Sequence, residues 1–436
     1  MKYDNYMYIE ALLKRIKNWF ISDKTDENVT TFSSINERQR IVEGVRRFFK
    51  TNYDLRYNVL KQTEEYRRKE PSIAHEEPLI AQQEPLISRE KASVWQQLTD
   101  REFRKMAIEQ MEQVGVAWSV DVELYVRSAL VPDYNPVLDY LGSCGTWDGQ
   151  TDYIRDLARR VPTSFDKWPD YFHSWMLAMV AQWLNLSREF GNAVVPILIG
   201  AQGTHKSTFC RLLLPPCLRE YYIDDIKLDN AEQVERMLSR MLLVNIDEYN
   251  AKTDREQAKI KRVLTEKNVQ TRKMRSDQYV LLPRMASFIA TTNDMEPLYD
   301  PTGSRRYLCC EVNGIINTST PIDHRAIYAQ AVAELQGGAQ WYFSKDDEAN
   351  IERHNQNYRR QPTPETVLLS YFEPAERCKE HFILAVDIQK ELRKYVRLTD
   401  VPSIKKLTLA LKACHFPYGK IQGVRGWYAR KRDLLS

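Results

Sequence analysis

The chain has 436 residues, of which 43% are hydrophobic and 28% charged, and its formal net charge is +4 at pH 7. This composition excludes a disordered or fibrous chain, and the length predicts about two or three domains with cores of their own. The small net charge alone does not indicate a nucleic-acid-binding protein. The positive charge is nevertheless concentrated near the C-terminus, because residues 386–436 hold twelve Lys and Arg but only four Asp and Glu.

Cysteine usage favours a cytoplasmic protein. The seven cysteines are scattered and form no C-x-x-C pair, which is typical of a reducing compartment rather than of a disulfide framework. Cys378, His381, Cys414 and His415 match no zinc-binding spacing well. The first 20 residues, MKYDNYMYIEALLKRIKNWF, predict an amphipathic helix and not a signal peptide.

Residues 1–190 predict three parts. Residues 1–70 contain helical stretches followed by YDLRYNVL, whose alternation suits a strand. Residues 71–90 include EPLI twice and show no periodic apolar face, so they predict an extended linker. Residues 91–190 predict a helical region, in which FHSWMLAMVAQWL from Phe172 is too short to span a bilayer and predicts a core helix. The part before the linker carries no identifiable chemistry, and we expect no membrane segment.

Residues 191–318 alternate short β-rich apolar runs with polar helical stretches, the pattern of a parallel α/β sheet. VVPILI, residues 194–199, predicts a buried strand that leads directly into GAQGTHKST and the helical FCRLLL. Gly200, Lys206 and Ser207 fit the phosphate-binding pattern G-x-x-x-x-G-K-[ST], although His205 stands where the second glycine belongs. The alternative is a surface loop that contains these residue types by chance.

The physical basis of such a site is a helix N-terminus, where backbone N–H groups and the helix dipole favour phosphate. Lys206 would reach the β- and γ-phosphates and the Ser207 hydroxyl would hold Mg²⁺, with Thr208 as a weaker alternative. If the position of His205 requires a positive φ, histidine adopts it more readily than most residues, at a cost of about 1–3 kcal/mol. The candidate nucleotide-binding residues are Gly200, Gly203, Thr204, His205, Lys206, Ser207 and Thr208.

A second candidate element is RMLLVNIDEYN, which predicts a buried strand over residues 241–246 followed by Asp247 and Glu248. Acids at the end of such a strand fit a site in which Asp247 holds Mg²⁺ and Glu248 polarises the attacking water. The plain alternative is an ordinary strand that ends in an acidic turn.

Two further segments complete the pattern. RMASFIATTND predicts a third strand that ends at Asn293, whose side chain could hold the lytic water near the γ-phosphate. DPTGSRRYLCCEV then places Arg305 and Arg306 after a glycine turn, where an arginine could stabilise transition-state charge. Adjacent arginines are otherwise ordinary solvated surface.

In this order, GAQGTHKST, LLVNIDEYN, FIATTND and DPTGSRRY resemble the ATPase core of the virulence-associated protein E family. These proteins are relatives of the superfamily 3 helicases within the AAA+ class and occur in phages and mobile elements. TWDGQTDYIRDLARRV and WMLAMVAQWL also resemble the helical lead-in of that family, so the resemblance covers about residues 133–312. It implies a P-loop NTPase core that uses ATP and Mg²⁺ to unwind DNA, generally as a ring of identical subunits.

The resemblance assigns roles to single residues. Lys206 with Ser207 matches the P-loop pair, Asp247 with Glu248 the acidic pair, and Asn293 the polar residue that ends the sensor strand. Arg305 and Arg306 match the arginine pair, one of which reaches the γ-phosphate of a neighbouring subunit. Family members more often have glycine at the position of His205.

Candidate DNA contacts come from two regions. Between the acidic and asparagine motifs, superfamily 3 relatives have a hairpin that grips DNA in the central channel, which makes Arg272, Lys273 and Arg275 candidates for phosphate contacts. A solvated basic turn is the alternative. Residues 319–365 predict a helical connector to the second region.

Residues 366–436 predict a small basic domain. DIQKELRKYV and IKKLTLALKA have helical spacing, and GKIQGVRGWYARKR predicts a hairpin that turns at Gly423 or Gly426. Helix, turn, helix and basic hairpin suggest a winged-helix-like module. Its candidate DNA contacts are Lys405, Lys406 and Lys412 on the second helix and Lys420, Arg425, Arg430, Lys431 and Arg432 on or after the hairpin. The alternative is a packing or partner-binding domain.

Taken together, the sequence predicts an α/β P-loop NTPase core with an AAA+-like parallel sheet, a helical N-terminal region and a small C-terminal winged-helix-like domain. The expected function is a DNA-dependent ATPase and replicative helicase of a phage or mobile element, with ATP and Mg²⁺ as ligands and single-stranded or forked DNA as partner. A nucleotide-gated DNA- or protein-binding switch is the alternative. A small-molecule P-loop kinase ranks third, because it would need neither Asn293 nor the paired arginines.

Overall fold

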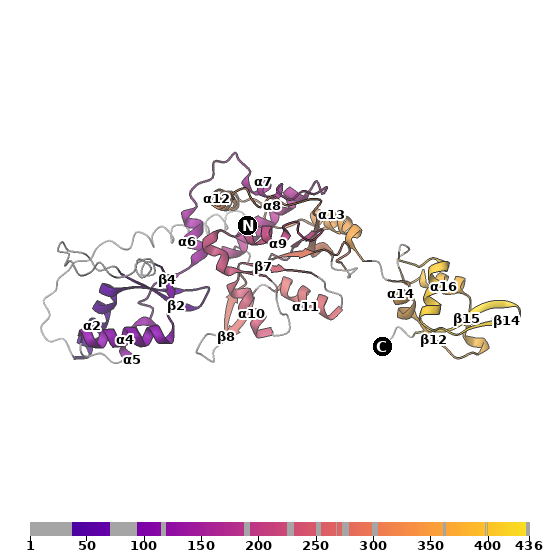
Figure 1. Ribbon diagram of the computed structural model, residues 1–436, viewed down its shortest axis with the longest axis horizontal. Helices are drawn as coiled ribbons and strands as arrows, with labels where there is room; N and C mark the ends of the chain where they lie inside the picture. The colour runs from indigo at the N-terminus through magenta and orange to yellow at the C-terminus, as the bar shows by residue number, and fades with distance from the viewer. Residues whose placement is uncertain are drawn as a thin grey trace. The chain divides into compact units, whose positions relative to one another are not determined.

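The computed structural model describes residues 37–69, 94–114, 119–186, 192–224, 231–249, 254–266, 268–272, 279–298, 304–360, 363–396, 398 and 400–432. The chain divides into two compact units, one formed by residues 1–295 and 302–355 and the other by residues 296–301 and 356–436 (Figure 1). The amphipathic helix expected at the N-terminus and the linker expected over residues 71–90 lie outside the described residues.

The first part of unit 1 is a small sheet covered by helices. Its strands run in the order β3-β2-β1-β4, with β1 antiparallel to β2 and parallel to β4. Phe48, Phe49, Met106 and Val122 form its core. The strand predicted from Tyr53 is confirmed. The elements are α2 (Glu37–Asn52), β1 (Tyr53–Asn58), β2 (Thr63–Arg68), β3 (Gln96–Gln97), α4 (Asp100–Val114), α5 (Ser119–Val126) and β4 (Asp133–Tyr134).

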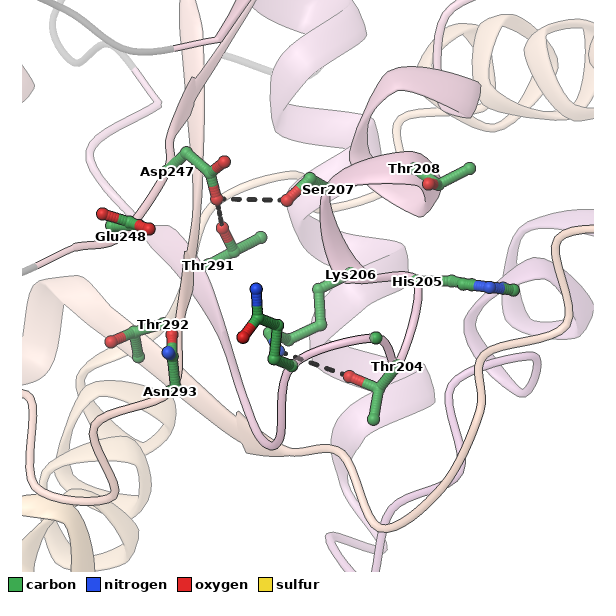
Figure 2. Close-up of a pocket in the computed structure, with 12 residues that line it drawn as sticks. Thr204, His205, Lys206, Ser207, Thr208, Asp247, Glu248, Thr291, Thr292 and Asn293 are labelled. Carbon is green, nitrogen blue, oxygen red and sulfur yellow. Dashed lines mark hydrogen bonds between the residues drawn. The ribbon is translucent and has the colours of Figure 1, made fainter.

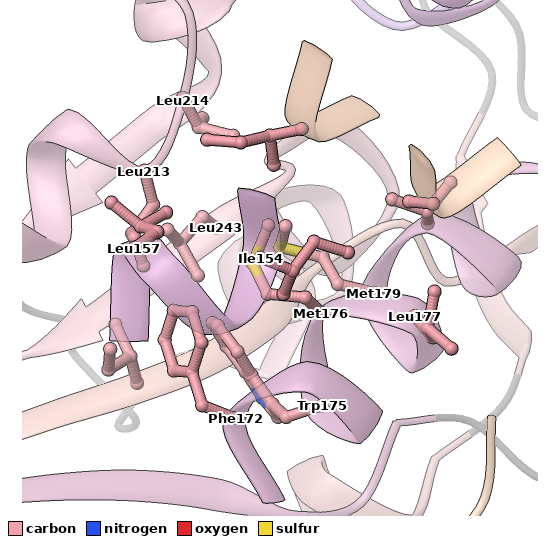
Figure 3. Close-up of a cluster of buried hydrophobic side chains, with 14 of the residues drawn as sticks. Ile154, Leu157, Phe172, Trp175, Met176, Leu177, Met179, Leu213, Leu214 and Leu243 are labelled. Atoms are coloured by element: carbon pink, nitrogen blue, oxygen red, sulfur yellow. The ribbon is translucent and has the colours of Figure 1, made fainter. Parts of the chain in front are cut away.

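Helix α8 (Trp168–Trp183) lies at the centre of the main core of unit 1. Most of its residues are buried, although Asp170 is exposed, and Phe172, Trp175 and Met176 are fully enclosed (Figure 3). The core helix predicted from Phe172 is therefore confirmed, and it begins earlier because a proline occupies its first turn. The helices α6 (Pro136–Ser143) and α7 (Tyr153–Ala158) precede it.

A five-stranded sheet, parallel throughout, forms the other side of this core and confirms the predicted parallel α/β arrangement. Its order is β11-β5-β10-β7-β6, so β10 lies between β5 and β7. The strand predicted over residues 241–246 begins two residues later, at Leu243. The strands are β5 (Val195–Ile199), β6 (Tyr222–Asp224), β7 (Leu243–Ile246), β10 (Ser287–Thr292) and β11 (Tyr307–Glu311).

Helices and one separate hairpin connect these strands. The hairpin consists of β8 and β9, which pair antiparallel. None of the helices in the described residues is long and apolar enough to cross a membrane. The connecting elements are α9 (Lys206–Leu212), η2 (Pro216–Tyr221), α10 (Ala231–Arg240), α11 (Asp254–Thr265), β8 (Asn268–Arg272), β9 (Tyr279–Pro283) and η3 (Ser304–Arg306). The helices α12 (His324–Gln336) and α13 (Lys345–Asn355) follow β11, the last strand of the sheet.

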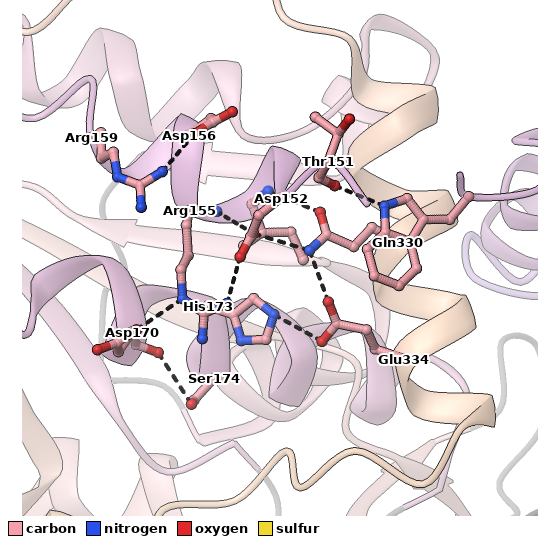
Figure 4. Close-up of polar contacts among 12 residues, drawn as sticks. Thr151, Asp152, Arg155, Asp156, Arg159, Asp170, His173, Ser174, Gln330 and Glu334 are labelled. Carbon is pink, nitrogen blue, oxygen red and sulfur yellow. Dashed lines mark hydrogen bonds and ion pairs between the residues drawn. The ribbon is translucent and has the colours of Figure 1, made fainter. Parts of the chain in front are cut away.

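Two buried polar groups hold these layers together. Arg284, 2% exposed, donates hydrogen bonds to five main-chain carbonyls. Three of them are at the end of α11, among them Leu264 O at 2.7 Å, and the other two are Asn192 O and Ala286 O, each at 2.8 Å. Burial lowers the pKa of Arg284 to about 9, so the guanidinium stays charged at neutral pH. His173 of α8 lies 2.8 Å from the carboxylate of Glu334 on α12, within a polar network at the surface of the core (Figure 4).

The described part of unit 2 combines the helices α14, α15 and α16 with a small antiparallel sheet in which β15 pairs with β12, β13 and β14. Its hairpin turns at Gly423, with φ +86°, whereas Gly426 pairs with Gly419 inside the hairpin. The two predicted helices and the predicted hairpin are confirmed. The elements are η4 (Gln356–Tyr358), α14 (Pro364–Tyr371), β12 (Phe372–Pro374), η5 (Lys379–His381), β13 (Phe382–Ile383), α15 (Ala385–Leu392), α16 (Ile404–Ala413), β14 (Tyr418–Ile421) and β15 (Val424–Lys431).

Candidate functional site

The loop between β5 and α9 needs special backbone geometry at three positions. A Cβ on Gly200 would lie 2.9 Å from the carbonyl oxygen of Val312, so only glycine allows this close approach. Gly203 has φ +82° and His205 has φ +65°. His205 thus adopts the left-handed conformation expected if this position requires a positive φ, directly before the first turn of α9.

Lys206 is the first residue of α9 and is 8% exposed. Its ammonium donates to Gly200 O at 2.8 Å, Ala201 O at 2.7 Å and Thr204 Oγ1 at 3.3 Å, which accounts for its three protons. Burial lowers the pKa of Lys206, and the charge of Asp247 partly opposes that shift. A phosphate that enters here would replace the loop's own oxygens as the acceptor.

Asp247 joins three elements at the edge of the sheet. Its Oδ1 accepts a hydrogen bond from Ser207 Oγ of α9 at 3.1 Å and another from Thr291 Oγ1 of β10 (Figure 2). Because β10 lies between β5 and β7, the carboxyl ends of all three strands meet at this edge. The sequence did not predict Thr291, since its contact with Asp247 depends on which strand lies beside β7.

Glu248 follows with φ +50°, a conformation that costs a non-glycine residue free energy. The turn is fixed by the next residue, Tyr249, whose backbone N–H donates to Thr291 O at 2.8 Å. The Tyr249 ring is 3% exposed and packs 5.6 Å from the Tyr307 ring, between centroids. In Figure 2 the Glu248 carboxylate lies on the far side of Asp247 from Ser207.

These groups line one pocket of about 290 Å³. It brings together Lys206, Ser207, Asp247, Glu248 and Asn293, which come from three neighbouring strand ends (Figure 2). Every lining residue except Gly203 has a polar side chain. The pocket is lined by Gln202, Gly203, Thr204, His205, Lys206, Ser207, Thr208, Asp247, Glu248, Thr291, Thr292 and Asn293.

Arg305 and Arg306 are not in this pocket. They precede β11, which is parallel to β5 with Tyr307 opposite Val195 and Glu311 opposite Ile199. The arginines therefore lie at the amino edge of the sheet, roughly 15 Å from the carboxyl edge that carries the pocket, since each strand residue spans about 3.3 Å. Arg305 pairs with Glu348 of α13 at 3.0 Å.

The predicted DNA contacts fall in two places. Arg272 ends β8 and lies opposite Tyr279 of β9 in the hairpin, while Lys273 and Arg275 lie outside the described residues. Lys405 and Lys406 occupy the first turn of α16 and are exposed, as is Arg425 in β15. Lysines at a helix N-terminus oppose the helix dipole, so this arrangement disfavours α16 by about 0.3–1 kcal/mol for each charge.

The basic residues of unit 2 differ in their partners. Within the described part of the chain, no carboxylate pairs with Lys405, Lys406 or Arg425. Three further candidates at the end of the hairpin have carboxylate partners: Arg430 and Arg432 share Glu373, and Lys431 pairs with Glu391. The Cys378 Sγ lies 3.1 Å from His381 Nδ1, but Cys414 and His415 do not join them in a metal-binding group.

The fold and pocket define a mixed α/β protein whose parallel sheet carries a polar site at its carboxyl edge. A model of the virulence-associated protein E-like domain matches residues 141–360, from α6 to just beyond α13, and the chain belongs to this family. The match includes the whole five-stranded sheet and every residue of the pocket. No curated protein matches the chain.

Similar solved structures are three of the NrS-1 C-terminal region. The apo structure of residues 305–718 is 12% identical in sequence and has a TM-score of 0.40. The match covers 90% of this chain and 99% of the chain in that structure. Two A-form apo structures are each 13% identical, with TM-scores of 0.35 and 0.39. The match to the first covers 72% of this chain and 72% of that structure's chain. The match to the second covers 88% of this chain and 98% of that structure's chain. Likeness at this level transfers no function.

Proposed function

We propose that the chain is a P-loop ATPase, similar to superfamily 3 helicases of the AAA+ class, that unwinds DNA during replication of a phage or mobile element. The observation that carries the proposal is the pocket in which Lys206, Ser207, Asp247, Glu248 and Asn293 meet. If the short motifs matched by chance, we would not expect a lysine, two acids and an asparagine from separate strand ends to line one pocket.

The donor groups suit a nucleotide with a magnesium ion. The loop presents a helix N-terminus and a lysine whose ammonium already binds oxygens, which are the acceptors that a triphosphate offers. Ser207 Oγ and Asp247 Oδ1 are 3.1 Å apart, so hard oxygen ligands lie side by side where Mg²⁺ prefers them. Bound there, Mg²⁺ would neutralise charge on the phosphate oxygens.

Hydrolysis needs a base and a group that orients water. Glu248 would accept the proton of the attacking water while the oxygen of that water bonds to the γ-phosphorus and the bond to the β-phosphate oxygen breaks. Asn293, on the neighbouring strand end, would hold the water in line. The positive φ of Glu248 supports this role, because strained backbone gathers at functional turns.

The arginines support assembly into a ring. Because Arg305 and Arg306 lie at the amino edge of the sheet, neither can reach the pocket of its own chain. A second copy would have to supply the arginine that stabilises the transition state. Light scattering with an ATP analogue and single-stranded DNA should therefore reveal an oligomer.

DNA contact is proposed for the β8–β9 hairpin through Arg272, Lys273 and Arg275, and for unit 2 through Lys405, Lys406 and Arg425. Replacing the last three with alanine should make the salt dependence of single-stranded DNA binding shallower by about 2, at about 0.7 per contact. Arg430→Ala is the matched control, because Arg430 already pairs with Glu373. An unchanged slope in the triple variant would contradict contact through unit 2.

The central test is ATP hydrolysis with and without DNA. Wild type should hydrolyse ATP faster with single-stranded DNA and should separate a forked duplex. Lys206→Ala should lower turnover by about 10²–10³-fold, the usual effect of removing one charge-stabilising donor. Lys167→Ala, an exposed lysine before α8, should have no effect. If wild type hydrolyses ATP but does not bind DNA, and DNA does not stimulate the hydrolysis, the proposed helicase function is wrong.

The alternative is a nucleotide-gated binding switch without processive unwinding. Two observations favour it: His205 replaces the usual glycine, and the Lys206 ammonium must leave three loop oxygens before it can bind phosphate. A His205→Gly variant that turns over ATP much faster than wild type would support the switch. Strand separation by wild type would exclude it.

A further inference from the structure

The segment that follows β11, residues 312–320, runs along the phosphate-binding loop and bonds to it; we name it the brace. At its start, the Val312 N–H donates to Ile199 O at 2.7 Å, and its carbonyl faces Gly200 at the close approach described above. Further along, the Ile316 N–H donates to Thr204 O at 3.1 Å. The brace therefore contacts both ends of the loop.

The other side of the brace is attached to the turn after α7. The Asn313 N–H donates to Pro162 O at 2.8 Å. The Arg160 guanidinium donates to the carbonyls of Thr320, at 2.6 Å, and Pro321, at 2.9 Å. The brace is thus held by the helical layer of the core, and it is a firm support for the loop.

One side-chain contact joins brace and loop directly. Thr318 Oγ1 lies 3.2 Å from His205 Nδ1. The His205 ring is exposed and, in Figure 2, points away from Lys206 and Asp247. The imidazole is therefore directed toward the brace rather than toward the place where phosphates would bind, although the backbone of His205 remains part of the loop. A glycine at this position could not make the contact.

We propose that His205 and Thr318 are positioning residues that hold the phosphate-binding loop in its binding conformation. Their contact fixes the left-handed residue before α9, so the amides of the loop point in one direction before a ligand arrives. This inference rests on the proposed nucleotide-binding function. A loop that is already ordered lowers the free-energy cost of binding but does not change the chemical step. Losing this order should therefore weaken the affinity for nucleotide and leave kcat unchanged.

The test uses variants on the brace. Thr318→Val keeps the side-chain shape and removes the hydroxyl, while Ser319→Ala removes a neighbouring hydroxyl that bonds to Asn317 and not to the loop. The dissociation constant for a non-hydrolysable Mg-ATP analogue, the kcat and KM for ATP, and amide hydrogen exchange of residues 200–208 in the free protein are measured for each. All variants are compared with wild type for their thermal midpoint.

Thr318→Val should weaken analogue binding by about 2- to 10-fold, as expected for one hydrogen bond, and should raise KM while kcat stays within about twofold. Exchange of the loop amides should become faster. Ser319→Ala should match wild type in every measurement. His205→Gly should show the same loss, and adding Thr318→Val to it should cause no further loss, because the two residues act through one contact.

Each failure has a distinct meaning. Unchanged loop exchange and affinity in Thr318→Val would overturn the proposal, and so would a fall in kcat at constant affinity. Tighter binding by His205→Gly would also overturn it, since the histidine would then hinder the site. If wild type binds no nucleotide but Thr318→Val still speeds loop exchange, the proposed function fails and the positioning role stands.

Discussion

Replacing Gly200 with alanine should destabilise unit 1 and impair the pocket through one steric contact. The new Cβ would lie 2.9 Å from Val312 O, closer than Cβ atoms in folded proteins approach a neighbour, and 3.2 Å from Val312 Cβ, which is also a tight contact. Overpacking of this kind costs about 1–3 kcal/mol. Because the nearest atom is a main-chain oxygen, relief requires β11 to move away from β5 at the point where the loop begins. Urea denaturation should show the loss, and affinity for a Mg-ATP analogue should fall as well.

Gly203→Ala is the matched control, since the Cβ there would meet nothing within 4 Å but φ is +82°. Its cost is purely conformational, about 1–2 kcal/mol. Asparagine tolerates positive φ, so Gly203→Asn should recover part of the stability. Gly200→Asn should recover none. A Gly200→Ala protein with wild-type stability and affinity would refute the close-approach argument.

Three further predictions concern other parts of the molecule. Arg284→Met should lower the free energy of unfolding, measured by urea denaturation, by at least about 3 kcal/mol, because buried carbonyls left without a donor cost about 1–3 kcal/mol each. Arg284→Lys should not restore it, as an ammonium lacks the guanidinium fork. Hydrogen bonds from Lys394 and Lys431 lower the pKa of Glu391 to about 2, so its contribution to unit 2 should disappear as the pH falls from 4.5 toward 2. Glu391→Gln should flatten that pH dependence of unfolding. Glu248→Gln should bind ATP but not hydrolyse it, as filter binding and phosphate release would measure.

The elements that carry the site could be predicted from sequence because each has a strong local pattern. VVPILI is an apolar run and SFIATT is an uncharged run rich in β-branched residues; each is long enough to cross the buried sheet, and both form strands. The first strand leads into a loop whose glycines meet local requirements of close approach and positive φ. The conformation of His205 was likewise open to prediction, since φ preference belongs to the residue itself.

What the sequence could not supply depends on contacts between distant segments. Thr291 bonds to Asp247 only because β10 lies beside β7, and Thr318 reaches His205 from 113 residues further along the chain. Partners also decide which charges of unit 2 are available. Arg430 and Lys405 look equivalent in sequence, but Glu373 pairs with the first and no carboxylate of the described residues pairs with the second. The number of basic residues can be read from the sequence, but DNA binding depends on which of them lack a carboxylate partner in the folded protein.

Strand β11 links the two edges of the sheet that the proposed reaction uses. Its first residue, Tyr307, follows the arginine turn and packs on Tyr249, next to the acidic pair. Its last residue is followed by Val312, where the brace begins against Gly200. The strand is buried and paired with β5 along its whole length, so a shift at one end cannot be absorbed within it. If an arginine of one copy serves the pocket of the next, the same five residues connect that arginine to the loop and acids of its own pocket. The pockets of neighbouring copies could then be coupled through β11 and the segments at its two ends alone.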